Sequence, residues 1–267
     1  MDKNTNIYRA LDRILYFSSS VNLLYDISIF LLRGVLGLIA LFNEKISRFV
    51  TGRKSTFDNL EKAIKRGDRT LWFHCASLGE FEQGRPVIEA LSDLNPDYKI
   101  VLTFFSPSGY EVQKDYAQAD VIAYLPVDSK KNARRFLKVV HPTLAVFVKY
   151  EFWPNILNEL KSQEIPTYLI SGIFREDQIF FKGYGGWMRK VLFGFSHFFV
   201  QNTQSLSLLK TLGIQQATLS GDTRFDRVFS LLEKDNTLSF LENFTSGKTT
   251  IVAGSTWPKD EELLTDF

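Results

Sequence analysis

The stretch "LWFHCASLGEFEQGRPVIEAL", Leu71 to Leu91, decides the fold. An apolar run of strand type stops at a small-residue turn, and an amphipathic segment of helical type follows it. The turn delivers Glu80 and Glu82 to the start of the predicted helix. Acidic side chains complement the helix dipole there, but the carboxyl end of a strand in an α/β protein is also where chemistry is usually placed. From this stretch alone both interpretations stay open.

The same alternation continues along the chain and predicts an α/β fold. Short apolar runs bounded by turn residues predict buried strands at 70–75, 98–104, 120–126, 143–148, 166–171, 197–201 and 217–221. Amphipathic segments between them predict helices, for example over 83–94, 130–140 and 205–212. Strands that alternate with helices in this way form a parallel sheet with helices on both faces.

Composition excludes several classes of protein. The 267 residues are 45% hydrophobic and 23% charged, which is typical of a globular chain. The single cysteine, Cys75, excludes an internal disulfide framework, and three scattered histidines argue against a zinc site. Basic and aromatic residues are not interleaved along a face, so no nucleic-acid partner is expected. His74 and Cys75 end a predicted strand and are interpreted as packing residues.

Residues 23–42, "LLYDISIFLLRGVLGLIALF", form the most apolar segment of the chain. Asp26, Arg33 and Gly37 align in one stripe of a helix, and apolar residues cover nearly all the remaining circumference. This pattern favours a one-sided membrane anchor over a clean span, with a buried helix of a soluble domain as the alternative. The basic flank at residues 45–54 suits an anionic cytoplasmic leaflet.

The pattern changes near Glu233. A polar stretch leads to "TTIVAGST", residues 249–256, which predicts a strand, and the following "WPKDEELLTDF" opens like a helix. We expect this to be the first strand–helix unit of a second domain. An eighth strand of the first sheet is the alternative.

Four polar clusters lie just beyond predicted strand ends, where open parallel sheets place their sites. The first spans residues 77–82. Gly79 allows a tight turn before a helix N-terminus that presents Glu80, and Ser77 precedes it. One glutamate can serve as a general base over a substrate hydroxyl, or both can be ordinary first-turn acids.

The second cluster is "SPSGYE", residues 106–111. Ser106 can cap a helix with Pro107 at its first position, which leaves the amides of Ser108 and Gly109 free to meet an anion. A simple helix cap explains the pattern equally well.

The third cluster is "KYEFWPN", residues 149–155. An ordinary loop does not need Trp153 beside the opposite charges of Lys149 and Glu151, so these three are candidate site residues. The alternative is a local Lys–Glu pair, which contributes little when it is exposed.

The fourth cluster is "SGDTRFDRV", residues 220–228. Asp222 and Asp226 flank Arg224, an arrangement that orients a guanidinium toward an anion or a developing negative charge. A capped helix start with surface ion pairs is the alternative.

Together, "HCASLGEFEQ", "SPSGYE", "KYEFWPN" and "SGDTRFD", in this order and spacing, resemble the 3-deoxy-D-manno-octulosonic acid (Kdo) transferases of Gram-negative lipopolysaccharide synthesis. The similarity runs from about Leu23 to the end of the chain. The first and third motifs are highly specific in combination.

The resemblance implies a two-domain GT-B glycosyltransferase that performs an inverting, metal-independent transfer without a cofactor. The N-terminal Rossmann-like half binds the lipid acceptor, a lipid A precursor of the lipid IVA type, and the C-terminal half binds the donor CMP-Kdo. Glu80 would be the general base, and Glu151 and Arg224 would support the transition state. Arg224 stands where a lysine is common, and Asp222 stands where an asparagine is common.

The resemblance also implies an organisation of the chain. We expect an N-terminal extension at 1–22, a membrane-anchor helix at 23–50, the acceptor-binding domain at 51–233, a linker at 234–248 and the start of a truncated donor-binding domain at 249–267. CMP-Kdo would bind through the missing C-terminal domain, so the chain alone is expected to be inactive. Its expected location is the cytoplasmic face of the cell inner membrane.

Two other functions remain open from the sequence. One is a membrane-anchored module that binds a lipid or protein partner without catalysis. The other is a GT-B glycosyltransferase that uses a different nucleotide-sugar donor.

Overall fold

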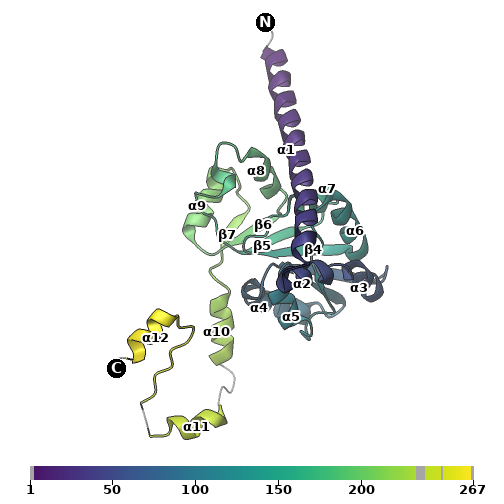
Figure 1. Cartoon of the computed structure of the whole chain (residues 1–267). Coiled ribbons are helices and arrows are strands. Elements are labelled where there is room, and N and C mark those ends of the chain that lie inside the picture. The colour runs from purple at the N-terminus through teal and green to yellow at the C-terminus, as the bar shows by residue number, and fades with distance from the viewer. Residues whose placement is uncertain (1–2, 233–237, 248, 266–267) are drawn as a thin grey trace. The chain divides into compact units, whose positions relative to one another are not determined.

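A computed structural model describes residues 3–232, 238–247 and 249–265 of the chain. The chain divides into two compact units, Met1–Arg227 and Val228–Phe267. The first unit contains the sheet and every cluster singled out above except the last residue of the fourth. Figure 1 labels the helices and strands of both units.

The first unit is built on a seven-stranded parallel sheet with the order β3-β2-β1-β4-β5-β6-β7. Its strands are β1 (Arg69–Cys75), β2 (Tyr98–Phe104), β3 (Val121–Tyr124), β4 (Pro142–Val148), β5 (Thr167–Gly172), β6 (His197–Val200) and β7 (Ala217–Leu219). The strands predicted within residues 70–221 are all confirmed, with small shifts at their ends.

The order of the strands reverses at β1. The chain steps outward from β1 to β2 and β3, and then returns to place β4 on the other side of β1. Leu71 consequently lies between Ile100 of β2 and Leu144 of β4. In open parallel sheets, ligands bind beyond the carboxyl ends of the strands at such a reversal point.

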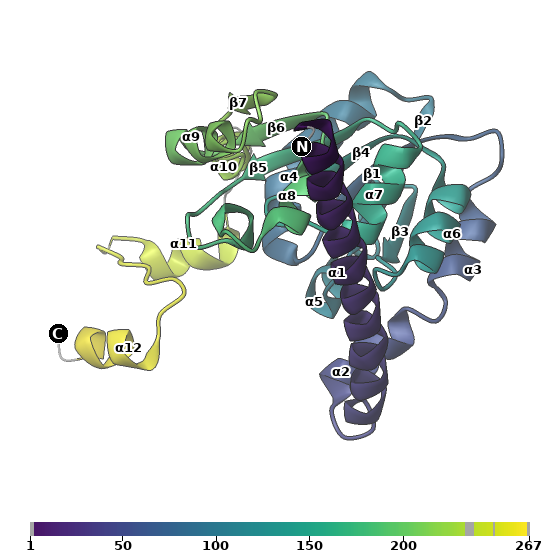
Figure 2. The same cartoon turned by 90° about the horizontal axis from the view of Figure 1, so that it is seen from above.

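Helices cover both faces of the sheet, as predicted (Figures 1 and 2). Buried side chains from one face pack with α3 (Thr56–Ala63), α6 (Lys130–Val140), α7 (Pro154–Ser162), α8 (Gly186–Leu192) and α9 (Thr203–Thr211). The opposite face packs with α4 (Leu78–Leu94) and α5 (Pro107–Gln113). Fully buried Trp72 forms the centre of the larger core, with its ring 4.7 Å from that of Phe136 and 5.1 Å from that of Phe147.

Two glycines let the helices of the smaller face lie close to the sheet and to each other. A Cβ at Gly84 of α4 would lie 3.1 Å from Val148 and 3.2 Å from the sulfur of Cys75. A Cβ at Gly109 of α5 would lie 2.5 Å from Phe104 and 3.2 Å from the backbone nitrogen of Leu78. Cys75 is buried and free, which confirms its interpretation as a packing residue.

The N-terminal helix α1 spans Lys3–Ile39 and runs without a break past residue 22. Its Val21–Ile39 portion has a mean hydropathy of 1.6, is long enough to cross a membrane, and has none of its residues buried. The alternative of a helix buried within the domain is therefore wrong. Tyr25 and Asp26 nevertheless contact the domain through their polar atoms.

The second helix, α2 (Glu44–Gly52), ends against the sheet. Arg53, just after it, donates hydrogen bonds to the backbone oxygens of Phe49, Phe105 and Leu125. Burial lowers the pKa of Arg53 to about 10. The sequence placed Arg53 in a basic flank that suits an anionic leaflet. This expectation is wrong for Arg53, because its side chain joins α2 to the domain.

The second unit contains the rest of α10 (Arg224–Leu232), then α11 (Ser239–Thr245) and α12 (Pro258–Thr265). The strand predicted at 249–256 is wrong, since these residues form neither helix nor strand. No described strand pairs with them, and an unpaired strand leaves its peptide groups to water. The helix expected after them is confirmed as α12, and residues 234–237 and 248 of the expected linker lie outside the described residues.

The two glycines of the first and second motifs give opposite expectations for stability. Gly109→Ala should lower the free energy of unfolding by about 1–3 kcal/mol, because its Cβ meets the buried ring of Phe104. Gly79→Ala is the matched control, since a Cβ there meets nothing within 4 Å and alanine favours a helix by about 1 kcal/mol. Urea unfolding of both variants measures the difference. Equal midpoints would contradict the close packing of α5.

Candidate active site

The carboxyl edge of the sheet brings the four polar clusters together. The first follows β1, the second follows β2, the third follows β4 and the fourth follows β7. Backbone contacts join neighbouring clusters directly. The amide of Ser106 donates to the carbonyl of Ala76 at 2.8 Å, and Thr223 donates through its hydroxyl to the carbonyl of Gln83 at 2.6 Å.

Glu80 lies in the first turn of α4, just beyond the carboxyl end of β1. Its Oε2 accepts hydrogen bonds from the Ser77 amide at 2.9 Å and the Ser77 hydroxyl at 3.3 Å, the arrangement of a capping box. Burial and then the negative charge of Glu151 raise the pKa of the Glu80 carboxyl, and these effects outweigh His74 and the Ser77 hydrogen bonds, which lower it. The residue is therefore both a helix cap and a carboxylate with strengthened affinity for a proton.

Glu151 reaches the same place from the end of β4. Lys149 adopts the left-handed backbone region with φ of 70°, which is uncommon for a residue with a side chain. The chain turns there, and Glu151 becomes almost fully buried. Its Oε2 accepts from the indole nitrogen of Trp153 at 2.7 Å and lies 3.1 Å from Nε2 of His74. Strained backbone of this kind is frequent at functional sites.

His74 is a site residue that the sequence did not identify. It is fully buried at the end of β1, where the sequence favoured a packing role. Its Nδ1 lies 2.9 Å from the hydroxyl of Thr103 and 3.1 Å from the Thr103 carbonyl. Its Nε2 contacts Glu151, so the ring links the ends of β1, β2 and β4. The available signal was a polar ring inside an apolar strand, but its partners are 29 and 77 residues away in the sequence.

Partly buried Glu80 lies near buried Glu151 and buried His74. The negative charge of Glu151 raises the pKa of the Glu80 carboxyl, whereas His74 lowers it. The Glu151 carboxylate is held by the Trp153 indole and contacts His74, whereas the donors on Glu80 belong to Ser77, three residues before it. Glu80 is thus the carboxylate that can exchange a cap for a substrate hydroxyl.

The second cluster supports the first. The Ser106 hydroxyl accepts from the Gly109 amide at 3.4 Å and lies 2.9 Å from the Ser108 hydroxyl. The expectation of a free Gly109 amide is therefore wrong, because the cap satisfies it. Gly109 is needed for the close approach of α5 to the backbone of Leu78, which places the turn that holds Glu80.

The predicted role of Gly79 in a turn before the helix is also wrong. Gly79 lies inside the first turn of α4 and not in a turn before the helix. No atom lies within 4 Å of a Cβ built there, so packing does not require a glycine at this position. The space beside the helix N-terminus is open to a ligand.

The fourth cluster is bound to α4 one turn beyond Glu80. Nε2 of Gln83 donates to Asp222 at 3.0 Å, and Nε of Arg224 donates to the same carboxylate at 2.8 Å. Burial opposes the ionisation of Asp222, but hydrogen bonds from Arg224 and Gln83 outweigh it and lower the pKa to about 2. Arg224 is thus oriented by Asp222 while its side chain stays 60% exposed. No contact joins Arg224 to Glu80 directly in the described structure.

Among the described contacts, Lys149 does not form the local pair with Glu151 that was the alternative interpretation of the third cluster. Its ammonium lies 5.2 Å from the centre of the Tyr150 ring, and the described partners of Glu151 are His74 and Trp153. The cation therefore lies at the site without neutralising the carboxylate.

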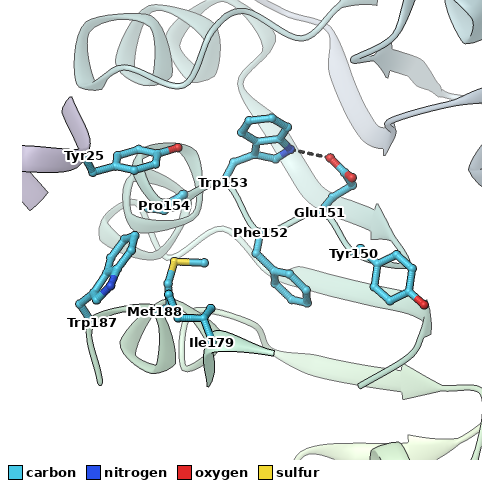
Figure 3. Close-up of a pocket in the computed structure, with 9 residues that line it drawn as sticks. All are labelled: Tyr25, Tyr150, Glu151, Phe152, Trp153, Pro154, Ile179, Trp187 and Met188. Carbon is cyan, nitrogen blue, oxygen red and sulfur yellow. Dashed lines mark hydrogen bonds between the residues drawn. The ribbon is translucent and has the colours of Figure 1, made fainter. Parts of the chain in front are cut away.

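A pocket of about 310 Å³ opens beside Glu151 (Figure 3). Figure 3 shows the Trp153 indole bonded to the Glu151 carboxylate on one side of the pocket. Its other walls are apolar or aromatic and come from α1, α8 and the short 3-10 helix η1 (Ile179–Phe181): Tyr25, Ile179, Trp187 and Met188. The rings of Tyr25 and Trp187 lie 5.9 Å apart. Such a pocket suits a ligand with both an apolar part and a polar group near Glu151.

Among the described residues, no group of three or more His, Cys, Asp or Glu side chains is arranged to hold a metal ion.

Comparisons with known proteins point to one family. A family model described as 3-deoxy-D-manno-octulosonic-acid transferase (kdotransferase) matches residues 47–227. The chain is 27% identical over 201 residues to a 3-deoxy-D-manno-octulosonic acid transferase of Rickettsia felis, covering 73% of this chain and 42% of that protein. It is 26% identical over 206 residues to the enzyme of the same name from Aquifex aeolicus, covering 76% of this chain and 51% of that protein. The chain spans about half the length of these relatives.

Solved structures share the fold. A structure from Listeria monocytogenes described as a UDP-N-acetylglucosamine 2-epimerase matches with a TM-score of 0.52 and 11% identity, over 68% of this chain and 52% of that one. A second UDP-N-acetylglucosamine 2-epimerase matches with a TM-score of 0.50 and 10% identity, over 67% of this chain and 55% of that one. These likenesses concern the α/β architecture, which confirms the predicted fold class of the first unit.

The carboxylate set predicts a measurable titration. Carbon-13 NMR of the Glu80 side chain should give a titration midpoint above the usual glutamate value, and Glu151→Gln should lower that midpoint because it removes a negative charge. A raised folded pKa means that Glu80 stabilises the fold below its unfolded pKa and loses this contribution as pH rises through the folded pKa.

Glu82→Gln is the control for this titration, because Glu82 pairs with Arg227 at 3.3 Å on the neighbouring face of α4. It should leave the Glu80 midpoint in place. If Glu151→Gln and Glu82→Gln shift the Glu80 midpoint equally, then the charge of Glu151 acts on Glu80 no more strongly than that of Glu82.

Proposed function

The chain belongs to the 3-deoxy-D-manno-octulosonic-acid transferase family, and we propose that it forms the acceptor-binding half of an enzyme that transfers Kdo in lipopolysaccharide synthesis. The proposed donor is CMP-Kdo, and the proposed acceptor is a phosphorylated lipid A precursor of the lipid IVA type. The transfer is inverting and needs neither metal nor cofactor. Residues 51–233 bind the acceptor, and residues 249–267 begin the donor-binding half.

One observation carries this proposal. Glu80 lies at the reversal point of the sheet with a raised pKa, beside Glu151 and next to an open helix N-terminus. A sugar hydroxyl is a poor nucleophile, and a carboxylate with increased proton affinity is suited to remove its proton.

The proposed reaction follows from these positions. The acceptor hydroxyl gives its proton to the Glu80 carboxylate while its oxygen forms a bond to the anomeric carbon of Kdo. The bond from that carbon to the phosphate oxygen of CMP breaks, and CMP leaves with the electron pair. Glu80 must be ionised at the start, and because both hydrogen bonds from Ser77 go to Oε2, the other carboxylate oxygen can take the proton.

The other site residues have supporting roles in this proposal. Glu151 is held by Trp153 and His74, and its negative charge keeps the proton affinity of Glu80 high. Arg224, oriented by Asp222, offers a cation to the phosphate of the acceptor or of the leaving group. Ser77, Gly79, Ser106, Ser108 and Lys149 line the approach of the acceptor in this proposal, and Gly109 supports them through the packing of α5.

The proposed location is the cytoplasmic face of the inner membrane. An amphiphilic acceptor lies in that bilayer, and the exposed apolar portion of α1, Val21–Ile39, supports anchoring of the acceptor-binding half beside it.

Replacing one carboxylate tests the proposed base. Glu80→Gln keeps the size of the side chain but removes the base, so transfer from CMP-Kdo to a lipid A precursor should fall by about 100- to 10,000-fold. Transfer is measured on the protein in full, including any residues that follow Phe267. Glu82→Gln is the matched control on the same helical turn and should retain transfer within a few-fold.

Two results would contradict this proposal. Transfer by Glu80→Gln at the rate of Glu82→Gln would remove Glu80 from the role of base. Transfer of a different sugar from another nucleotide donor, with no transfer from CMP-Kdo, would reject the proposed donor.

A further inference from the structure

Two adjacent residues of α1 are bonded to the domain, Tyr25 to the loop before α6 and Asp26 to the start of α7. The hydroxyl of Tyr25 donates to Oδ2 of Asp128 at 2.9 Å, and Oδ1 of Asp26 accepts from Nδ2 of Asn155 at 2.9 Å. Both partners lie more than 100 residues away in the sequence. These contacts lie at the base of the apolar helix rather than on its exposed face.

Asp128 is the centre of this contact. Its carboxylate is buried and accepts from the amides of Asn155 at 3.0 Å and Ile156 at 2.9 Å in addition to Tyr25. The pKa of Asp128 is raised to about 6, mainly by burial, so it is ionised at neutral pH with all three donors fixed on it. A buried carboxylate holds its donors tightly because an unpaired donor or charge in the interior is costly.

Asn155 contacts both Asp128 and Asp26. Its side-chain nitrogen donates to the Asp128 carbonyl at 2.9 Å as well as to Asp26. The remaining oxygen of Asp26 pairs with Lys130 at 3.0 Å. The Asp26 carboxylate is thus paired with groups of the domain, which explains why a charged residue lies within an apolar helix.

These contacts of Asp128 and Asn155 lie directly beside the candidate active site. α7 begins at Pro154, immediately after Trp153, and the Trp153 indole is a donor to Glu151. The amides that Asp128 holds, Asn155 and Ile156, belong to the first turn of this helix. Tyr25 also forms a wall of the pocket that Glu151 lines (Figure 3). The start of α7 therefore sets the position of Trp153 and Glu151.

We propose that Tyr25 and Asp26 are positioning residues of the active site, and that the seating of α1 on Asp128 and Asn155 holds the loop of residues 149–155 with Glu151 in place. The apolar helix is then part of the site and not an anchor alone. The importance of Glu151 rests on the proposed function, whereas the seating rests on the contacts themselves.

NMR of the chain in detergent micelles tests the seating without an activity assay. The double variant Tyr25→Phe with Asp26→Leu removes both contacts. We expect amide hydrogen exchange at Asn155 and Ile156 to become at least ~10-fold faster, because their acceptor Asp128 loses its bond from Tyr25 and Asn155 loses its bond to Asp26. We also expect the imidazole nitrogen-15 shifts of His74 to change, since they report its contact with Glu151.

Arg33→Leu is the matched control. Arg33 is an exposed charge on the same helix, and both leucine substitutions make the helix more apolar. This variant should leave the exchange rates and the His74 shifts as they are. The single variant Asp26→Asn should keep the exchange rates within about 2-fold of those of the unchanged protein and leave the His74 shifts in place. An amide oxygen at this position still accepts from Asn155. Unchanged exchange at the Trp72 amide of β1 shows that each variant is folded.

The proposal is overturned if the double variant matches Arg33→Leu in both measurements. It is also overturned if the His74 shifts stay constant while the exchange at Asn155 and Ile156 rises, because the seating would then not reach Glu151. A double variant that changes both measurements supports the proposal, even if Glu80→Gln retains transfer and the proposed function fails.

Discussion

The parallel pairing of β1 with β4 is the constraint on which the rest of the site depends. Because β2 and β3 lie on one side of β1 and β4 lies on the other, the strand order reverses between β1 and β4, where sheets of this kind place their sites. Glu80 reaches this edge from the first turn of α4 and Glu151 from the loop after β4. His74, on β1 itself, bonds to Glu151 and connects the two strand ends beneath the surface.

The sequence was sufficient for the parts of the structure that local chemistry controls. Apolar runs between turn residues located the strands of the sheet, because a strand buried on both faces must be apolar throughout. The four polar clusters followed strand ends, and parallel strands bring such ends to one edge. The role of Ser106 as a helix cap was also predictable, because capping depends on residues three apart.

Features that depend on distant contacts were not predictable. His74 reads as a packing residue until Thr103 and Glu151 are seen beside it. Asp26 reads as one polar position in an apolar helix until Asn155 is found to bond to it. The apolar run at 249–256 predicts a strand, yet a strand needs a neighbour that no described residue supplies.

Separate binding of two ligands in detergent micelles tests the central claim, that this chain holds the acceptor side of a Kdo transferase. The ligands are a phosphorylated lipid A precursor and CMP, each titrated against the 267-residue chain. The account predicts saturable binding of the lipid and no binding of CMP. Binding of CMP without the lipid would contradict it, because the assignment of the two halves would be reversed and Glu80 could not act on an acceptor hydroxyl.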